Sequence, residues 1–137
     1  MSAKEFSLDI SAFIEKTTKN VDAKVSKICL DLFSGITMET PVDQGRAINN
    51  WFPSIGTASN QTTTSLDPSG KASIARAQAV VKNAPGNVFW ISNNLPYIYR
   101  LEFGGYPPGP KVVAGYSAKA PRGMVRITID RIQRELR

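Results

Sequence analysis

Residues 93–106, NNLPYIYRLEFGGY, form a short apolar stretch bounded by residues that start and stop helices. Asn94 suits a helix N-cap, Pro96 fits the first turn, and Gly104 with Gly105 can take the left-handed conformation that ends a helix. The stretch therefore predicts a helix of about two turns. This helix is apolar on both sides, and a single small core covers only one of them.

The two sides of this helix carry different residues. At about 100° per residue, Tyr97, Ile98 and Leu101 fall on one side, and Tyr99 and Phe103 fall on roughly the opposite side. If one side packs on the core, either a long loop of the same chain or another protein has to cover the other. Aromatic residues suit a subunit interface because they bury large areas at a low entropy cost. The interface candidates are Tyr97, Tyr99, Arg100, Glu102, Phe103 and Tyr106.

A long amphipathic helix is predicted in the N-terminal third of the chain. Large apolar residues recur at helical spacing from Val21 to Ile36, and the positions between them include several charged residues. We expect the helix to start near Ser7 or Asp9, to bend or break at 17–20, and to end before TPVDQGR.

Two short strands and two further helices follow. NNWFPSIGT predicts a strand with Pro53 at an edge or bulge, and NVFWISN predicts a second strand. Between them we expect an exposed loop at about 57–66, then a middle helix with Asp67 as N-cap and Pro68 at the first helical position. A C-terminal helix is predicted behind Pro121. Its apolar face is formed by Val125, Ile129, Ile132 and Leu136.

These elements predict, in chain order, a helix, a strand, a helix, a strand, a short helix, a loop and a C-terminal helix. We expect residues 1–137 to form a single domain. The Pro/Gly-rich segment at about 104–120 predicts a long loop with a short extended piece at Val112 and Val113. This loop is expected to be mobile in the free subunit and ordered by neighbouring subunits. No apolar run reaches the roughly 20 residues of a membrane helix, so no membrane association is expected.

The charge is concentrated at the C-terminal end. The formal net charge is +6, and from Lys111 onward there are seven basic residues against two acidic ones. This asymmetry indicates an acidic partner or nucleic acid near the C-terminus. Arg122, Arg126 and Arg134 fall near one side of the predicted C-terminal helix. They are either solvated, or they meet an acidic ring of protein or DNA in a channel.

The residues give no support for an enzyme, a cofactor or a metal site. There is no histidine, which removes Ser/His and Cys/His nucleophile pairs, and a single cysteine, Cys29, fits a buried thiol. Asp43 is expected to be a turn residue that bonds nearby backbone amides. Glu102 lies among aromatics and needs a partner, which is Arg100, Arg126 or an arginine of a neighbouring subunit. We expect a structural ion pair there rather than an acid catalyst.

Three blocks of the chain resemble, in the same order, the phage tail completion family, the minor tail components of the head-to-tail connector in long-tailed bacteriophages. The blocks are TPVDQGRAINNW at 40–51, ISNNLPYIYRLEFG at 91–104 and APRGMVRITI at 120–129. Gln44 stands where a small hydroxyl residue is common in the family. The matching positions, which the resemblance makes scaffold and interface positions, are Pro41, Val42, Asp43, Gly45, Trp51, Asn94, Pro96, Tyr97, Leu101, Glu102, Gly104, Pro121, Gly123, Met124, Val125 and Arg126.

The resemblance implies an α+β fold, with a small, mainly antiparallel sheet packed with a long N-terminal helix, a middle helix and a C-terminal helix. It also implies a structural virion protein of the phage neck or tail, which completes the tail and joins it to the head connector within an oligomeric ring around the DNA channel. The ring is expected to be a hexamer, made in the host cytoplasm and located in the virion. Its implied partners are further copies of itself, a head-side adaptor or stopper, and a tail terminator or tail tube, with phage DNA passing through without sequence-specific binding. The residues also leave an alternative, a small basic nucleic-acid-binding module with Tyr106 and Tyr116 for stacking.

Overall fold

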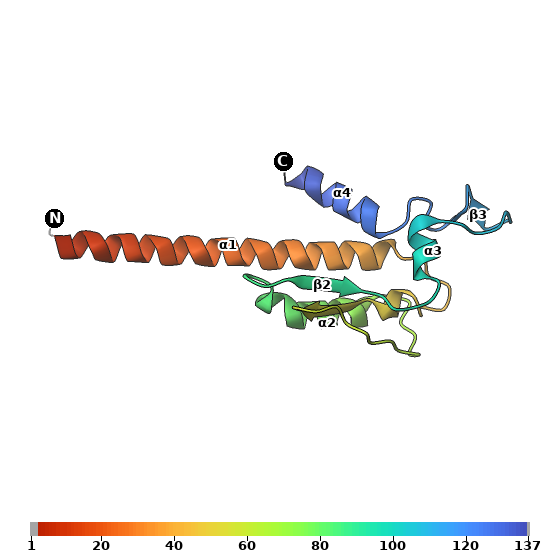
Figure 1. The fold of residues 1–137 in the computed structure, drawn as a ribbon, viewed down its shortest axis with the longest axis horizontal. Coiled ribbons are helices and arrows are strands. Elements are labelled where there is room, and N and C mark those ends of the chain that lie inside the picture. Colours follow the sequence, from red (N-terminus) through yellow and green to blue (C-terminus); the bar gives the residue numbers. More distant parts are fainter. Residues whose placement is uncertain (1–2, 137) are drawn as a thin grey trace.

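The computed structural model describes the backbone of residues 3–136 and the side chains of residues 15–136. It has the α+β architecture that the sequence predicts (Figure 1). The long helix α1 has the sheet of β1 and β2 with α2 on one side and α4 on the other. In chain order, the elements are α1 (Ala3–Glu39), the 3-10 helix η1 (Ile48–Asn50), β1 (Phe52–Ile55), α2 (Lys71–Val80), the 3-10 helix η2 (Val81–Asn83), β2 (Phe89–Ser92), α3 (Ile98–Phe103), β3 (Val112–Val113), β4 (Tyr116–Ser117) and α4 (Val125–Glu135).

Helix α1 is continuous over 37 residues and therefore about 55 Å long. It begins earlier than predicted, and the predicted bend or break at 17–20 is wrong. Ion pairs between residues one turn apart lie along it, with Lys19 Nζ 3.4 Å from Glu15 Oε1 and Lys27 Nζ 2.7 Å from Asp31 Oδ2. Such pairs support a helix whose Thr and Asn residues are weak helix formers.

Among the side chains of α1 that the structure describes, from Glu15 onward, those of the C-terminal half are packed. Phe33 and Ile36 are buried, whereas every residue from 15 to 24 is exposed, including Val21 at 53%. The N-terminal half of the helix projects beyond all other elements (Figure 1). The apolar face predicted for α1 is therefore covered only where the rest of the chain reaches it. No helix of the described part is long and apolar enough to span a membrane.

The sheet is a two-stranded antiparallel ribbon. β1 pairs with β2 so that Phe52 lies opposite Ser92 and Ile55 lies opposite Phe89. Each strand has a neighbour on one side only, so both are edge strands. Proline, which has no backbone N–H to donate, is tolerated in an edge strand, and Pro53 is therefore accommodated in β1. Both predicted strands are thus confirmed.

Helix α2 begins later than predicted. It starts at Lys71, after Gly70 with φ of 76°, so Asp67 is not the N-cap residue and Pro68 is not in the helix. The Asp67 carboxylate still accepts a hydrogen bond from the Ala72 N–H at 2.8 Å. The intervening turn brings Gly70 against α1 and η1, where a Cβ would lie within 3.1 Å of methyl groups of both elements.

Helix α4 lies on α1 at Gly35. A Cβ at this position would lie 2.6 Å from Thr128 Cγ2 and 2.5 Å from Arg131 Nη2, so glycine allows the close approach of the two helices. Arg131 also pairs with Glu39 of α1 at 3.8 Å. Thr128 is buried, and its hydroxyl donates a hydrogen bond to the Met124 carbonyl at 2.7 Å.

The apolar face predicted for α4 is only partly correct. Ile132 is buried and Val125 is half-buried, but Ile129 and Leu136 are 39% and 61% exposed. The small Thr128 takes the central position instead, because only a short side chain fits against a glycine at this helix crossing.

The Pro/Gly-rich segment at 104–120 contains the extended piece that was predicted. Val112 and Val113 pair with Ser117 and Tyr116 in the hairpin β3–β4. Its two central residues have φ of 52° at Ala114 and 86° at Gly115, which is the pattern of a type I′ turn.

The hydrophobic core draws on all three sequence blocks. Trp51, Leu101 and Met124 come from the first, second and third block, respectively, and all are buried. Trp51 also donates its Nε1–H to Thr40 Oγ1 at 2.8 Å. The full cluster is Phe33, Ile36, Ala47, Trp51, Ala77, Leu95, Leu101, Ala120 and Met124.

Candidate functional site

Helix α3 has two different sides, as predicted. Leu101 is buried, and Tyr97 and Ile98 are half-buried. Tyr99 and Phe103 are 68% and 48% exposed, and their ring centroids are 4.6 Å apart. The Pro/Gly-rich loop leaves this aromatic pair largely uncovered. Of the two alternatives that the sequence left open, cover of this side by the chain's own loop is therefore not what the structure shows.

The predicted N-cap of α3 is wrong. The side-chain amide of Asn94 donates to the Ser59 and Gln61 carbonyls, at 2.9 and 3.0 Å, and the helix begins only at Ile98. Pro96 lies exposed in the turn before it. The Asn94 side chain binds the polar loop instead, because the carbonyls of that loop lie outside the sheet and have no partner strand.

The end of α3 is as predicted. Gly104 has φ of 81°, and its N–H donates to the Arg100 carbonyl at 2.8 Å. A Cβ at Gly104 would lie 3.2 Å from the Gly115 carbonyl oxygen and from the ring of Tyr116. The left-handed glycine therefore ends the helix and also lets the β3–β4 hairpin pack closely against it.

Glu102 is buried and holds the start of α4. Its carboxylate accepts hydrogen bonds from three consecutive backbone N–H groups, those of Met124 at 2.7 Å, Val125 at 2.8 Å and Arg126 at 2.9 Å. The Nε of Arg126 completes the set at 3.0 Å from Oε1. Of the three arginines considered as partners, the structure selects Arg126. Glu102 acts as a capping residue supplied from another helix, because α4 has no side-chain cap of its own.

Two opposing effects act on the pKa of Glu102. Burial by itself raises the pKa of this carboxyl group, but the hydrogen bonds from three backbone N–H groups and from Arg126 favour the charged form and outweigh it. The pKa of Glu102 is therefore lowered from its ordinary value. The group is a carboxylate at neutral pH, as a structural ion pair requires.

Gly123 is required by this arrangement. It has φ of 76°, and a Cβ there would lie 2.5 Å from Glu102 Oε2 and 2.6 Å from the Glu102 carbonyl oxygen. The glycine of the third block thus allows the carboxylate of the second block to reach the helix start.

Arg126 connects this buried cap to the exposed aromatic pair. Its guanidinium lies over the ring of Phe103, 4.6 Å from the centroid, and donates to the Glu102 carbonyl and to Tyr116 Oη, the latter at 3.3 Å. These contacts hold the Phe103 ring, which is still 48% exposed.

The other two arginines of the predicted basic side lie apart from Arg126. Arg122 is exposed in the turn before α4, so it does not share a helix face with the others. Arg134 pairs with Asp130 at 2.8 Å. The expected single basic side of the C-terminal helix is therefore wrong, because α4 begins only at Val125 and Arg126 is used to bind Glu102.

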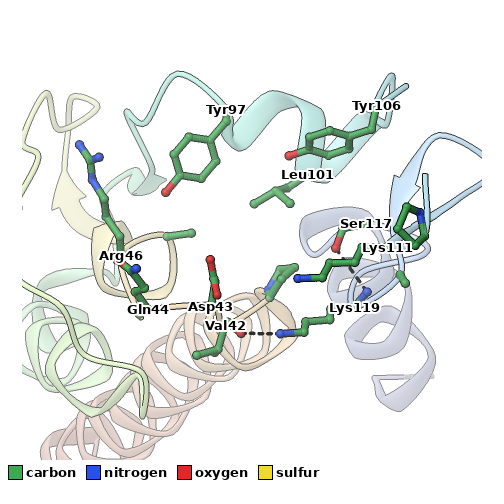
Figure 2. A pocket seen from close by; sticks show the side chains of 15 residues that line it. Val42, Asp43, Gln44, Arg46, Tyr97, Leu101, Tyr106, Lys111, Ser117 and Lys119 are labelled. Atoms are coloured by element: carbon green, nitrogen blue, oxygen red, sulfur yellow. Dashed lines mark hydrogen bonds between the residues drawn. The ribbon is translucent and has the colours of Figure 1, made fainter. Parts of the chain in front are cut away.

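A pocket of about 560 Å³ lies beside α3 and is lined by Tyr97 and Leu101, not by the aromatic pair (Figure 2). Tyr97, Leu101 and Tyr106 point into it from one wall. The turn that follows α1 forms the facing wall, and the end of the β3–β4 segment closes one side. Arg100 lies over the ring of Tyr106 at 5.9 Å, on the outer side of this wall.

The rim of the pocket carries four charged residues. Asp43 and Arg46 belong to the turn after α1, and Lys111 and Lys119 belong to the hairpin segment (Figure 2). Lys119 Nζ donates to the Val42 carbonyl at 2.8 Å and so joins the two walls. Three basic residues against one acidic residue make this rim basic.

The turn of the first block is shaped by Gly45 rather than by Asp43. Gly45 has φ of 92°, and a Cβ there would lie 2.4 Å from the Pro68 nitrogen. Asp43 is exposed, and no hydrogen bond to its carboxylate is formed by the part of the chain that the structure describes. The expectation that Asp43 bonds nearby amides is therefore wrong. Pro41 and Val42 are half-buried beside the pocket, and Pro121 is exposed before α4.

Sequence reasoning missed the role of the two Asn-Asn pairs. Asn50 both donates to and accepts from Thr63, at 3.0 Å in each case, and Asn49 donates to the Ser65 carbonyl at 3.0 Å. Asn93 donates to the Ala47 carbonyl at 3.1 Å. Asn49, Asn50 and Asn94 thus hold the exposed polar loop at 57–66, whereas Asn93 bonds the residue before η1. The sequence signal that could have indicated this role is the repeated Asn-Asn pair directly before a large apolar residue, Trp51 in one case and Leu95 in the other.

The described residues contain no group of three or more His, Cys, Asp or Glu side chains that could hold a metal ion. Cys29 is half-buried, and burial raises the pKa of its thiol. Searches against protein-family models, curated proteins and solved structures found no match.

Proposed function

We propose that this chain is a structural subunit of the neck or tail of a long-tailed bacteriophage. In this role it completes the tail and joins it to the head connector as part of an oligomeric ring around the DNA channel. The observation that carries the proposal is the exposed aromatic pair, Tyr99 and Phe103. Two exposed aromatic rings in contact on a short, firmly anchored helix are typical of a subunit contact rather than of a solvated surface.

The anchoring of α3 supports this role. Glu102 binds the start of α4, Leu101 lies in the core, and Gly104 contacts the hairpin, so the aromatic pair is held on a rigid element. Preorganised aromatic side chains lose little entropy on association. The three blocks that carry the resemblance to the tail completion family also supply this anchoring.

The proposed partners are further copies of the chain and the neighbouring neck and tail proteins, namely a head-side adaptor or stopper and a tail terminator or tail tube. The proposed location is the virion, with no enzymatic activity and no cofactor. A hexameric ring is proposed from the resemblance alone.

A deletion of the gene from its phage genome tests the role directly. Electron microscopy of the lysate should show DNA-filled heads and separate or defective tails. Intact, infectious particles would exclude the role, and empty heads would place the defect in packaging or DNA retention instead.

A small basic nucleic-acid-binding module is the second candidate, favoured by the basic residues of the C-terminal end. Three of its arginines, Arg126, Arg131 and Arg134, are paired with carboxylates in the structure, which lowers the charge left for phosphates. Such a module should bind short DNA duplexes as a monomer, with an affinity that falls steeply with salt. Binding of that kind by the wild-type chain, lost in an Arg122→Gln, Arg134→Gln double variant, would favour it over the connector.

A further inference from the structure

The pocket beside α3 has a composition that selects its occupant. Its wall is formed by the apolar and aromatic side chains of Tyr97, Leu101 and Tyr106, and its rim is basic. A fitting occupant therefore combines large apolar residues with acidic ones.

The first turns of α1 have this composition. Residues 3–15, AKEFSLDISAFIE, include three acidic residues and one lysine, together with Phe6, Leu8, Ile10, Phe13 and Ile14. The acidic residues are Glu5, Asp9 and Glu15.

The projecting half of α1 also needs a partner. Residues 15–24, which directly follow, are all exposed, and Thr17, Thr18 and Asn20 are weak helix formers. Helices of this kind are marginal in water without tertiary packing. Contact with another surface would supply that packing.

The same chain cannot bring these two features together. The pocket is built on the turn that follows Glu39, at one end of the molecule, and the projecting half of α1 lies at the other end (Figure 1). Because α1 is continuous, about 45 Å of helix separates its first turns from the pocket.

We propose that the first turns of α1 from one copy of this chain dock in the pocket beside α3 of the next copy. The contact joins opposite ends of two identical molecules, so it is head-to-tail, and its repetition closes a ring or extends a filament according to the rotation per subunit. The inference rests on the proposed function as a self-assembling subunit. It leaves Tyr99 and Phe103, on the other side of α3, for a different contact.

Charge reversal on each side of the contact tests the proposal with the full-length chain. One variant carries Glu5→Lys and Asp9→Lys, and the other carries Lys111→Glu and Lys119→Glu. A control, Lys71→Glu with Lys82→Glu, makes the same charge change as the Lys111, Lys119 variant at exposed positions of α2 and η2, away from the pocket. Sedimentation velocity over a concentration series measures assembly, and thermal unfolding followed by circular dichroism measures folding.

The wild-type chain and the control should assemble alike, and each reversal variant alone should assemble with an apparent dissociation constant raised on the order of tenfold or more, because like charges then meet. An equimolar mixture of the two reversal variants should recover assembly, since each end then finds a complementary one on the other variant. Each variant should unfold at the same temperature as the wild type to within a few degrees.

Three results would overturn the inference. They are a wild-type chain that stays monomeric at every concentration, reversal variants that assemble like the wild type, or a mixture that recovers nothing. If a variant is less stable than the control, the equimolar mixture still tests the contact, because recovery of assembly requires both chains to be folded. The solution experiment needs no virion, so its failure can be told apart from failure of the proposed function. If the solution experiment fails but the gene deletion still yields DNA-filled heads separate from tails, the inference is rejected and the proposed function is kept.

Discussion

Glu102 in α3 and Arg126 in α4 bind each other through both side chain and backbone. The Arg126 backbone N–H and Nε both donate to Oε1, at 2.9 and 3.0 Å, and the guanidinium also donates to the Glu102 carbonyl. The same carboxylate accepts the N–H groups of Met124 and Val125. One side chain thus fixes the position of two helices and, through the stacking of Arg126 on Phe103, the orientation of the exposed aromatic pair.

Glu102→Gln should lower the free energy of unfolding by about 1 to 3 kcal/mol. The amide retains one acceptor oxygen, but its NH₂ group faces backbone donors, so buried N–H groups of α4 lose their acceptor. Urea unfolding measures the change. Glu135→Gln, at an exposed position of α4, is the matched control, and its free energy of unfolding should stay within about 0.5 kcal/mol of the wild-type value. Equal stabilities for the two variants would contradict the capping role.

The same pair predicts a pH dependence. The pKa of Glu102 in the folded chain lies below its ordinary value of 4.5, so the carboxylate contributes stability that is fully present above about pH 4.5. That contribution is lost as the pH falls through the lowered folded pKa. The stability advantage of the wild type over Glu102→Gln should therefore be constant near neutral pH and shrink below about pH 4.5. An advantage that grows on acidification would show that the sign is wrong.

Gly123→Ala should be more destabilising than Gly86→Ala. Both glycines have φ of 76°, so both substitutions carry the same left-handed strain of about 1 to 2 kcal/mol. A Cβ at Gly86 meets nothing within 4 Å, whereas at Gly123 it lies 2.5 Å from Glu102 Oε2. The difference between the two free energies of unfolding isolates the clash with the capping carboxylate. If the two values agree, Glu102 moves away without cost and the contact is not tight.

The two sides of α3 should respond to substitution in opposite ways. Leu101→Ala should cost about 2 to 5 kcal/mol of stability, since Leu101 is in the core. Tyr99→Ser with Phe103→Ser should leave the monomer folded and block assembly, because these side chains are exposed in the single chain. Denaturant unfolding and sedimentation velocity measure the two effects. Loss of the cooperative unfolding transition in the Tyr99, Phe103 double variant would assign the pair to the core.

The segment at 104–120 should gain amide protection when the chain assembles. It is held mainly by a two-residue ladder and a type I′ turn, and most of its residues are exposed. Hydrogen exchange followed by mass spectrometry should show fast exchange in the monomer and slow exchange in the ring. The strands β1 and β2 serve as the internal reference, and equal protection of the segment in both states would mean that neighbours do not order it.

Local patterns were sufficient wherever the structure depends on neighbours along the chain. The helical spacing from Val21 to Ile36, the two strands around Pro53 and Trp90, and the stop at Gly104 were all predicted correctly. Each depends on periodicity or on the dihedral freedom of one residue, which the sequence states directly.

Several of the predictions that failed depend on how segments distant in the sequence pack together. Asn94 was assigned to the nearest helix start, but it bonds carbonyls 33 and 35 residues away. Asp43 and the face of α4 were judged from their own segments in the same way. A polar side chain bonds the partner that the fold brings next to it, and that partner does not show in local spacing.

What the sequence alone determined, then, is the set of helices and strands, the two-sided nature of α3 and the need of Glu102 for a partner. Only the tertiary structure decided that this partner is the start of α4, that Gly35 admits Thr128, and that the turn after α1 faces α3 across a pocket. The reason is physical. Backbone preferences act within a few residues, whereas Glu102 and Met124 are 22 residues apart and meet only because packing of the core brings their segments together.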